Sequence, residues 1–233
     1  MTREPGNLPE SLHLNAGRGA PAAPDSSLSF KAAPRRLSCL RDRRLQRHVS
    51  HREGSSAVAT PDIGAGGARS GKSRHAESLI EAEGTSCAYI ATAQAFDAEM
   101  EARIAAHRAR RGAQWTTFEA PMALGEVLQS ADVAGRPVLV DCLTLWLSNL
   151  MLEDRDVMRE IGGLLALLPN LDAPLVMVSN EVGLGIVPDN ALARSFRDHA
   201  GYLNQQLAAA ADQVVFLAAG LPLTLKTPEG TDR

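Results

Sequence analysis

The segment Gly66-Gly67-Ala68-Arg69-Ser70-Gly71-Lys72-Ser73 has the spacing G-x-x-x-x-G-K-[ST] of a phosphate-binding loop. Its glycines let the backbone curl so that several N–H groups point inward at phosphate oxygens. Lys72 supplies a cation for the β- and γ-phosphates, and the Ser73 hydroxyl is a candidate ligand of Mg²⁺. A helix predicted to begin near Ser73 adds its positive N-terminal end. The segment therefore predicts a nucleoside triphosphate site in which Lys72 is catalytic.

Downstream of this loop, short apolar runs alternate with stretches of helical pattern. The runs lie at 87–91, 137–140, 174–178 and 213–218. The helical stretches lie near 73–83, 97–111, 122–131, 156–168 and 190–211. Continuously apolar runs of this length are typical of strands buried on both faces. An α/β fold, with a mostly parallel sheet and helices on both faces, is therefore predicted for residues 61–233.

The stretch before the phosphate loop departs from this pattern. A phosphate loop normally follows a strand, but residues 57–65 contain Pro61 and Asp62. Proline cannot donate a hydrogen bond to a central strand, and an aspartate does not belong in a core. We therefore expect the first strand to be weak or interrupted.

Residues 1–60 differ in composition from the remainder of the chain. They carry 10 Lys and Arg against 5 Asp and Glu, whereas residues 61–233 carry 14 against 22. Their content of Pro, Gly, Ser, Ala and Arg predicts a disordered tail. A tail without a role, a nucleic-acid-binding arm and a targeting peptide all fit this composition. Because a basic run is usually just solvated, the tail contributes little to the functional prediction.

The whole chain has 233 residues, a formal net charge of −3 and 45% hydrophobic residues, which is typical of a globular protein. No apolar stretch approaches the roughly 18 residues that span a bilayer, so we expect no membrane span and a cytoplasmic location. Cys39, Cys87 and Cys142 are widely separated and form no CxxC pair. They are expected to be free thiols.

Polar residues follow two of the predicted strands. Asp141 ends one apolar run, which places a carboxylate where ligands of open parallel sheets bind. It is a candidate Mg²⁺ ligand together with Ser73, and a helix cap or turn residue is the alternative. Asn180 and Glu181 follow the next strand, where they indicate either contact with a ligand or metal or a structural turn.

Glu99, Arg103, His107 and Arg111 recur every four residues, so they would form one polar stripe on a helix over 97–111. An imidazole can attack an α-phosphate, and neighbouring arginines can hold phosphates. The spacing alone favours a solvated, salt-bridged helix face over a nucleophile.

Four stretches in this order resemble the bifunctional adenosylcobinamide kinase / adenosylcobinamide-phosphate guanylyltransferase family of cobalamin biosynthesis. They are GGARSGKSRHAE (66–77), YIATAQAFDAEMEARIAAHR (89–108), VLVDCLTLWLSNLM (138–151) and the segment 179–226. The resemblance implies a RecA-like P-loop NTPase fold and a homotrimer with sites between subunits. It also implies phosphorylation of adenosylcobinamide by a nucleoside triphosphate, ATP or GTP, with Mg²⁺. GMP is then transferred from GTP to adenosylcobinamide-phosphate through a guanylyl-histidine.

The resemblance also implies roles for particular residues. His107 stands where the guanylylated histidine belongs, which makes it the second catalytic residue beside Lys72. Ala93 stands where a hydroxyl side chain is often found. The implied nucleotide-binding positions are Gly66, Gly67, Ala68, Arg69, Ser70, Gly71, Lys72, Ser73, Ala91, Thr92, Ala93, Arg108, Ala109, Arg110, Arg111, Glu119 and Asp141.

Two other functions compete with this one. A plain P-loop small-molecule kinase would have no need of His107. A nucleic-acid-binding P-loop ATPase would use the basic tail, and its binding would fall steeply with salt. The resemblance favours the bifunctional enzyme, for which no nucleic-acid partner is expected.

Overall fold

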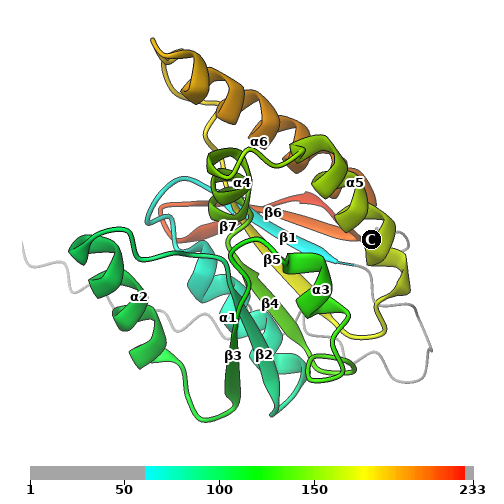
Figure 1. The fold of residues 1–233 in the computed structure, drawn as a ribbon. Coiled ribbons are helices and arrows are strands. Elements are labelled where there is room, and N and C mark those ends of the chain that lie inside the picture. Colours follow the sequence, from blue (N-terminus) through cyan, green and yellow to red (C-terminus); the bar gives the residue numbers. More distant parts are fainter. Residues whose placement is uncertain (1–60, 229–233) are drawn as a thin grey trace, which may run out of the picture. The chain divides into compact units, whose positions relative to one another are not determined.

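The structure, a computed structural model, describes residues 61–228. The segment 1–60, for which a disordered tail is predicted, and Cys39 within it lie outside the described residues. Within residues 61–228, seven strands form one sheet in the order β3-β2-β4-β5-β1-β6-β7 (Figure 1). Neighbouring strands are parallel except for the antiparallel pair β6 and β7.

The bounds of the strands follow the apolar runs closely. The strands are β1 (Asp62–Gly66), β2 (Cys87–Ala91), β3 (Trp115–Glu119), β4 (Val138–Asp141), β5 (Leu175–Asn180), β6 (Gln213–Ala218) and β7 (Leu221–Lys226). The four predicted runs are confirmed as β2, β4, β5 and β6, whereas β3 and β7 were not predicted.

Helices connect the strands. They are α1 (Lys72–Glu83), α2 (Ala98–Arg110), α3 (Leu124–Leu128), α4 (Leu143–Leu152), α5 (Val157–Leu167), a 3₁₀ turn (Leu168–Asn170) and α6 (Ala191–Ala210). The five predicted helices are confirmed, and α4 was not predicted. No helix in the described part of the chain is both long and apolar enough to cross a membrane.

Two apolar clusters cover the two faces of the sheet. On one face, Ala76 and Ile80 of α1 pack with Leu139 and Val176 of the central strands. The larger cluster on the other face includes residues of α3, α4, α5 and α6. Trp146 of α4 is 1% exposed within it. The predicted α/β class, a mostly parallel sheet with helices on both faces, is confirmed.

The expectation of a weak first strand is wrong. Strand β1 is a central strand whose residues pair in parallel with β5 and with β6. It begins at Asp62, so Pro61 stands just outside the ladder, where its missing N–H costs nothing. The Pro61 carbonyl accepts a hydrogen bond from the Asp212 amide at 3.2 Å. Buried Ile63 then leads directly into the phosphate loop.

Candidate active site

The phosphate loop is packed against the turn that joins β6 and β7. Gly66 and Gly71 have φ angles of 154° and 97°, which other residues rarely adopt. A Cβ on Gly66 would lie 2.6 Å from the Leu217 carbonyl oxygen, and one on Gly71 would lie 3.2 Å from the Gly220 Cα. The Gly220 amide also donates to the Ser70 carbonyl oxygen at 2.9 Å. The glycines are therefore required by both backbone conformation and close packing.

Lys72 is directed into this loop. Its side chain is buried, and its Nζ donates to the Gly67 carbonyl oxygen at 3.0 Å. Burial lowers the pKa of Lys72, and the nearby Cys142 and Asp141 raise it in part. The buried Ser70 hydroxyl has no hydrogen-bond partner within residues 61–228. A phosphate group in the loop would supply acceptors for both side chains.

Asp141 is the last residue of β4, at the carboxyl edge of the sheet. Its Oδ2 accepts a hydrogen bond of 3.0 Å from the Tyr89 hydroxyl. Burial, followed by the charge of Asp141, raises the pKa of Tyr89, so the phenol remains a neutral donor. Tyr89 opens the stretch 89–108 that resembles the family, but no role was predicted for it.

Asp141 and Ser73 fit the demands of Mg²⁺, which typically takes one or two carboxylates together with phosphate and water oxygens. Within the described residues, no cluster of three or more His, Cys, Asp or Glu side chains could hold a metal by itself. A magnesium ion at this site would therefore depend on oxygens of the bound nucleotide.

Thr92, one of the implied nucleotide-binding residues, faces the interior. It is fully buried, and its hydroxyl accepts from the Cys142 amide at 2.8 Å and donates to the Cys142 carbonyl at 2.7 Å. Its carbonyl accepts from the Asn149 side chain at 2.8 Å. The neighbouring Ala91 pairs with Asp141 across the sheet, and Ala93 is half-buried. The Thr92 side chain thus supports the Asp141 segment.

His107 lies in the last turn of α2 and is half-buried. Asp97 caps this helix by accepting from the Met100 amide at 2.7 Å. No residue of α2 is buried. Glu99 and Arg103 of the predicted polar stripe form a long ion pair of 3.9 Å. Packing in the core therefore does not fix the position of this helix.

The C-terminal end of α2 is held by arginine side chains. Arg108 pairs with Glu119 at the end of β3. Arg110 pairs with Glu77 of α1 at 2.9 Å. These contacts tie the C-terminal end of α2, which carries His107, to α1 and to the end of β3.

Arg111 does not extend the polar stripe, which corrects the expectation from its four-residue spacing. The helix ends at Arg110, and Arg111 has an extended backbone with φ of −78° and ψ of 133°. Its guanidinium carbon lies 3.5 Å from the centroid of the Tyr89 ring. One nitrogen donates to the Thr117 hydroxyl at 3.3 Å, so the side chain turns toward the sheet.

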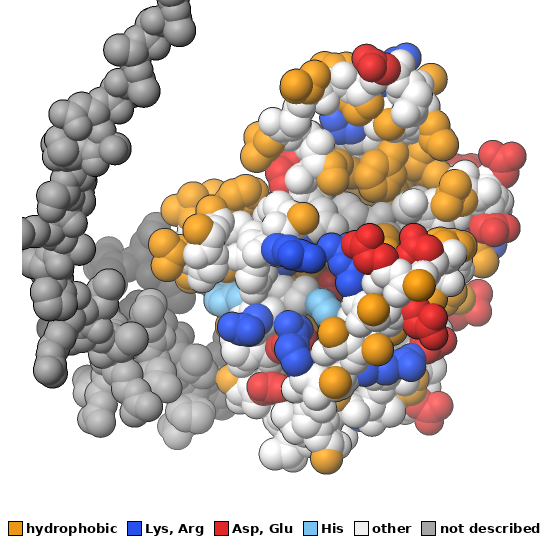
Figure 2. Space-filling model, turned by 90° about the vertical axis from the view of Figure 1, so that its left-hand side faces the viewer, with side chains coloured by type: hydrophobic (Ala, Val, Ile, Leu, Met, Phe, Trp, Pro, Cys, Tyr) orange, Lys and Arg blue, Asp and Glu red, His pale blue; other side chains and the backbone are white. Residues whose placement is uncertain are grey.

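Figure 2 shows the side of the molecule on which α2 lies in Figure 1. Lys, Arg and His side chains gather there around a hollow, with acidic groups at its border. Such a concentration of positive side chains suits an anionic ligand.

Asn180 and Glu181 support the phosphate loop. The Asn180 amide donates to the Thr144 hydroxyl at 2.7 Å, and the Glu181 backbone amide donates to the Gly66 carbonyl at 3.0 Å. The Glu181 carboxylate accepts from the Gly183 amide at 2.6 Å. Of the two predicted roles, the structure favours the structural turn.

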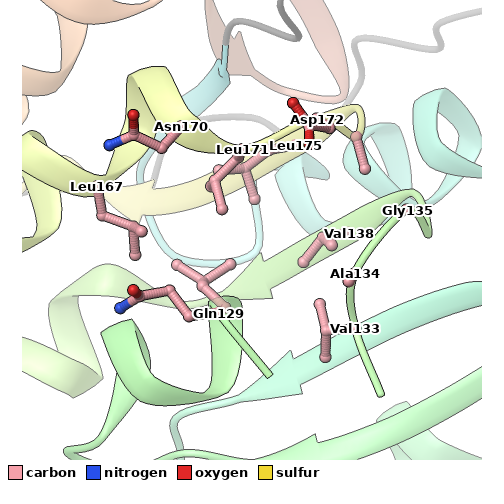
Figure 3. Close-up of a pocket in the computed structure, with 12 residues that line it drawn as sticks. Gln129, Val133, Ala134, Gly135, Val138, Leu167, Asn170, Leu171, Asp172 and Leu175 are labelled. Carbon is pink, nitrogen blue, oxygen red and sulfur yellow. The ribbon is translucent and has the colours of Figure 1, made fainter. Parts of the chain in front are cut away.

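Two cavities lie outside the phosphate loop. One of about 250 Å³ is lined by Val138 and Leu175, the first residues of β4 and β5, and by side chains such as Leu167 and Gln129 (Figure 3). It is therefore at the opposite edge of the sheet from Asp141. A second, of about 420 Å³, adjoins Glu119 and lies among α3, α4 and α5.

The parallel sheet, the glycine-rich loop that enters α1 and the buried Lys72 define a P-loop protein that binds nucleoside triphosphates. Residues 64–225 match the family model described as "Cobinamide kinase / cobinamide phosphate guanyltransferase". The chain belongs to this family.

Two relatives of similar sequence agree with this assignment. The chain is 53% identical over 168 residues to the "Bifunctional adenosylcobalamin biosynthesis protein CobP" of Pseudomonas aeruginosa, covering 71% of this chain and 96% of that protein. It is 43% identical over 176 residues to the corresponding CobU of Escherichia coli, covering 69% and 97%. Among solved structures, flagellar accessory protein FlaH from Methanocaldococcus jannaschii is similar with a TM-score of 0.47 at 12% identity, covering 72% of this chain and 79% of that one.

Proposed function

We propose that this chain phosphorylates adenosylcobinamide with a nucleoside triphosphate and then transfers GMP from GTP to adenosylcobinamide-phosphate, giving adenosylcobinamide-GDP. The observation that carries the proposal is the 53% identity to the CobP protein over 96% of its length. The phosphate loop and His107 both lie within the residues that match the family.

In the kinase reaction, the phosphate loop holds the nucleotide. The charge of Lys72 offsets the negative charge on the transferred phosphoryl group. Ser73 and Asp141 would hold Mg²⁺, which supplies charge neutralisation between the phosphates. The N-terminal end of α1 adds a favourable dipole, and its first turn carries no acidic residue to oppose it.

In the guanylyl transfer, His107 is the proposed nucleophile. A ring nitrogen attacks the α-phosphorus of GTP, a new N–P bond forms, and the bond between the α-phosphorus and the bridging oxygen breaks. Pyrophosphate leaves with the electron pair of the broken bond. The phosphate of adenosylcobinamide-phosphate then attacks the same phosphorus, which forms the diphosphate and releases the histidine.

The kinase assignment is tested with Lys72→Ala. Loss of the cation is expected to lower the rate of adenosylcobinamide phosphorylation by about a hundredfold or more, because the reaction depends mainly on electrostatic stabilisation. The thermal unfolding midpoint shows whether the variant is folded. Near-normal phosphorylation by a folded variant would contradict the role of the loop.

The transferase assignment is tested with His107→Ala and GTP labelled at the α-phosphate. Wild-type protein should retain a label that acid removes and base leaves, as a phosphoramidate would. The variant should retain none while still phosphorylating adenosylcobinamide, since Lys72 and Asp141 are untouched. The matched control is His75→Ala, since His75 is a half-buried histidine on α1. Persistent labelling of the His107 variant would place the nucleophile elsewhere, and a plain kinase would show no label in any form.

We also propose a cytoplasmic homotrimer with sites between subunits. Unpaired Cys87 and Cys142 suit a reducing compartment. Leu221, Leu223 and Leu225 on the edge strand β7 are 71%, 59% and 60% exposed, which suits an apolar contact with another subunit. Leu223→Glu should shift the mass measured by light scattering from three chains to one.

A further inference from the structure

We propose that Tyr89 is a positioning residue that joins the two halves of the site. Its hydroxyl orients Asp141, and its ring holds Arg111 at the end of the helix that carries His107. This inference rests on the proposed function, because it assigns roles toward the metal and the guanylylated histidine.

The contact with Asp141 is specific. Tyr89 is 4% exposed, and its hydroxyl donates to one carboxylate oxygen at 3.0 Å. Trp115 packs edge-on against the Tyr89 ring, with centroids 6.0 Å apart, and so restricts its movement. A buried neutral donor that engages one carboxylate oxygen fixes the direction of the other. Asp141 is therefore presented in one orientation before any ligand binds.

The contact with Arg111 anchors α2. The guanidinium lies 3.5 Å from the ring centroid, a distance typical of a cation–π interaction. Thr117, the partner of Tyr89 in the neighbouring strand, accepts a hydrogen bond from the same side chain. Because α2 buries none of its residues, such contacts at its C-terminal end determine where His107 stands.

Arg111 also has a hydrogen-bond donor that could bind an anion. Its Nη1 is buried and has no hydrogen-bond partner in the described part of the chain. An unpaired buried N–H group is costly, and a phosphate oxygen would satisfy it. Holding the guanidinium against Tyr89 keeps this donor in place, so one ring supports both the metal carboxylate and a phosphate contact.

Two substitutions separate the two contacts. Tyr89→Phe removes the hydroxyl and keeps the ring over Arg111. Tyr89→Leu removes both the hydroxyl and the ring. If the leucine variant fails to fold, Tyr89→Met is used in its place. Equilibrium titration of Mg²⁺ in the presence of a fluorescent ATP analogue measures the first contact. The acid-labile label from GTP at saturating Mg²⁺ measures the second, and Asp141→Asn is the reference for metal binding.

For Tyr89→Phe we expect the Mg²⁺ concentration at half-maximal nucleotide binding to rise about fivefold or more, in the direction of Asp141→Asn. For Tyr89→Leu or Tyr89→Met we expect the initial rate of labelling to fall about fivefold or more below that of Tyr89→Phe. Folding is checked by the thermal unfolding midpoint.

Each of the two measurements has an outcome that would contradict the proposal. An unchanged Mg²⁺ requirement in Tyr89→Phe, with a raised one in Asp141→Asn, would overturn the hydroxyl's role. Equal labelling rates in the phenylalanine and leucine variants would overturn the ring's role. An Asp141→Asn protein with a normal Mg²⁺ requirement would instead overturn the metal role of Asp141, and the hydroxyl's role with it. A wild-type protein without label would overturn the proposed guanylyl transfer, and the ring's role with it.

Discussion

Helices α2 and α4 each follow a strand that ends at the site, β2 and β4, yet they are held in opposite ways. Of the residues of α4, six are buried, among them Trp146 and Asn149, and they face the core or the Asp141 segment. Helix α2 has none, and it is held by arginine contacts at its C-terminal end. The same sheet thus carries a rigid support beside Asp141 and a lightly held helix that bears His107.

This difference matches the two reactions that we propose. The kinase half needs the loop, Lys72 and Asp141 in fixed positions, because its catalysis is mostly positioning and electrostatics. The transferase half needs a histidine that meets GTP, carries GMP and then meets a different substrate. Elements with few buried contacts are the ones that open and move at low cost in free energy.

The largest effect is expected from Trp146→Ala in α4. Trp146 is 1% exposed, and its indole N–H donates to the Met122 carbonyl at 2.9 Å. Its removal should lower the free energy of unfolding by about 3–5 kcal/mol, from the cavity and the lost burial. Denaturant unfolding measures the change. A loss below about 1 kcal/mol would mean that α4 is not the rigid support described here.

Asn149→Ala should have the next largest effect. The Asn149 amide donates to the Thr92 carbonyl at 2.8 Å and to the Pro121 carbonyl at 2.9 Å, and the side chain is buried. Both carbonyls would lose this donor, at a cost of about 1–3 kcal/mol in the free energy of unfolding. Asn149→Asp, which keeps the size and removes the donor, should behave similarly. Wild-type stability in both variants would contradict this support of Thr92.

A pair of matched cap substitutions sharpens the comparison further. Asp97 caps α2, and Asp156 caps α5 by accepting from the Arg159 amide at 3.1 Å. Asp156→Ala should lower the free energy of global unfolding by about 1 kcal/mol. Asp97→Ala should increase hydrogen exchange within α2 by about fivefold, with a smaller change in global stability, because α2 opens on its own. Equal global losses would show that α2 unfolds with the core.

The smallest effect is expected from Glu77→Gln, which removes the ion pair with Arg110. Paired charges that are partly exposed contribute about 0.2–1 kcal/mol, and the contribution falls with salt. Hydrogen exchange of α2 at low and high salt measures it. At low salt, α2 should exchange faster in the variant than in the wild type. In high salt the two proteins should exchange at the same rate, because salt screens the ion pair of the wild type. A difference between them that does not change with salt would contradict an ionic anchor.

Sequence patterns predicted most of the sheet and five of the helices because buried strands and amphipathic helices have clear periods. Helix α4 was missed since its sequence, LTLWLSNLML, is apolar on nearly every side and shows no helical period. Strand β3 alternates around two threonines, and β7 is an exposed edge strand with Pro222, so neither reads as a buried run. Pro61 led to the wrong prediction of a weak first strand, because β1 starts one residue later, at Asp62.

The site was predictable only where a motif carries the chemistry. The glycine spacing predicted the loop that enters α1 with Lys72, and the strand end predicted Asp141 as a candidate ligand at the edge of the sheet. The contacts of Tyr89 and Thr92 depend on which strands are neighbours, and a single sequence does not specify that order. Arg111 shows the same limit, since a change of backbone direction after Arg110 removed it from the expected stripe.

The most direct measurement is the location of the guanylyl group on the chain. Wild-type protein is incubated with GTP and Mg²⁺, digested with trypsin under mildly basic conditions, and analysed by mass spectrometry. The mass of GMP should appear on the peptide Ile104-Ala105-Ala106-His107-Arg108, which lies between two cleavage sites. A GMP group on a peptide containing His75 or His199 instead, with residues 104–108 unmodified, would contradict the assignment of His107.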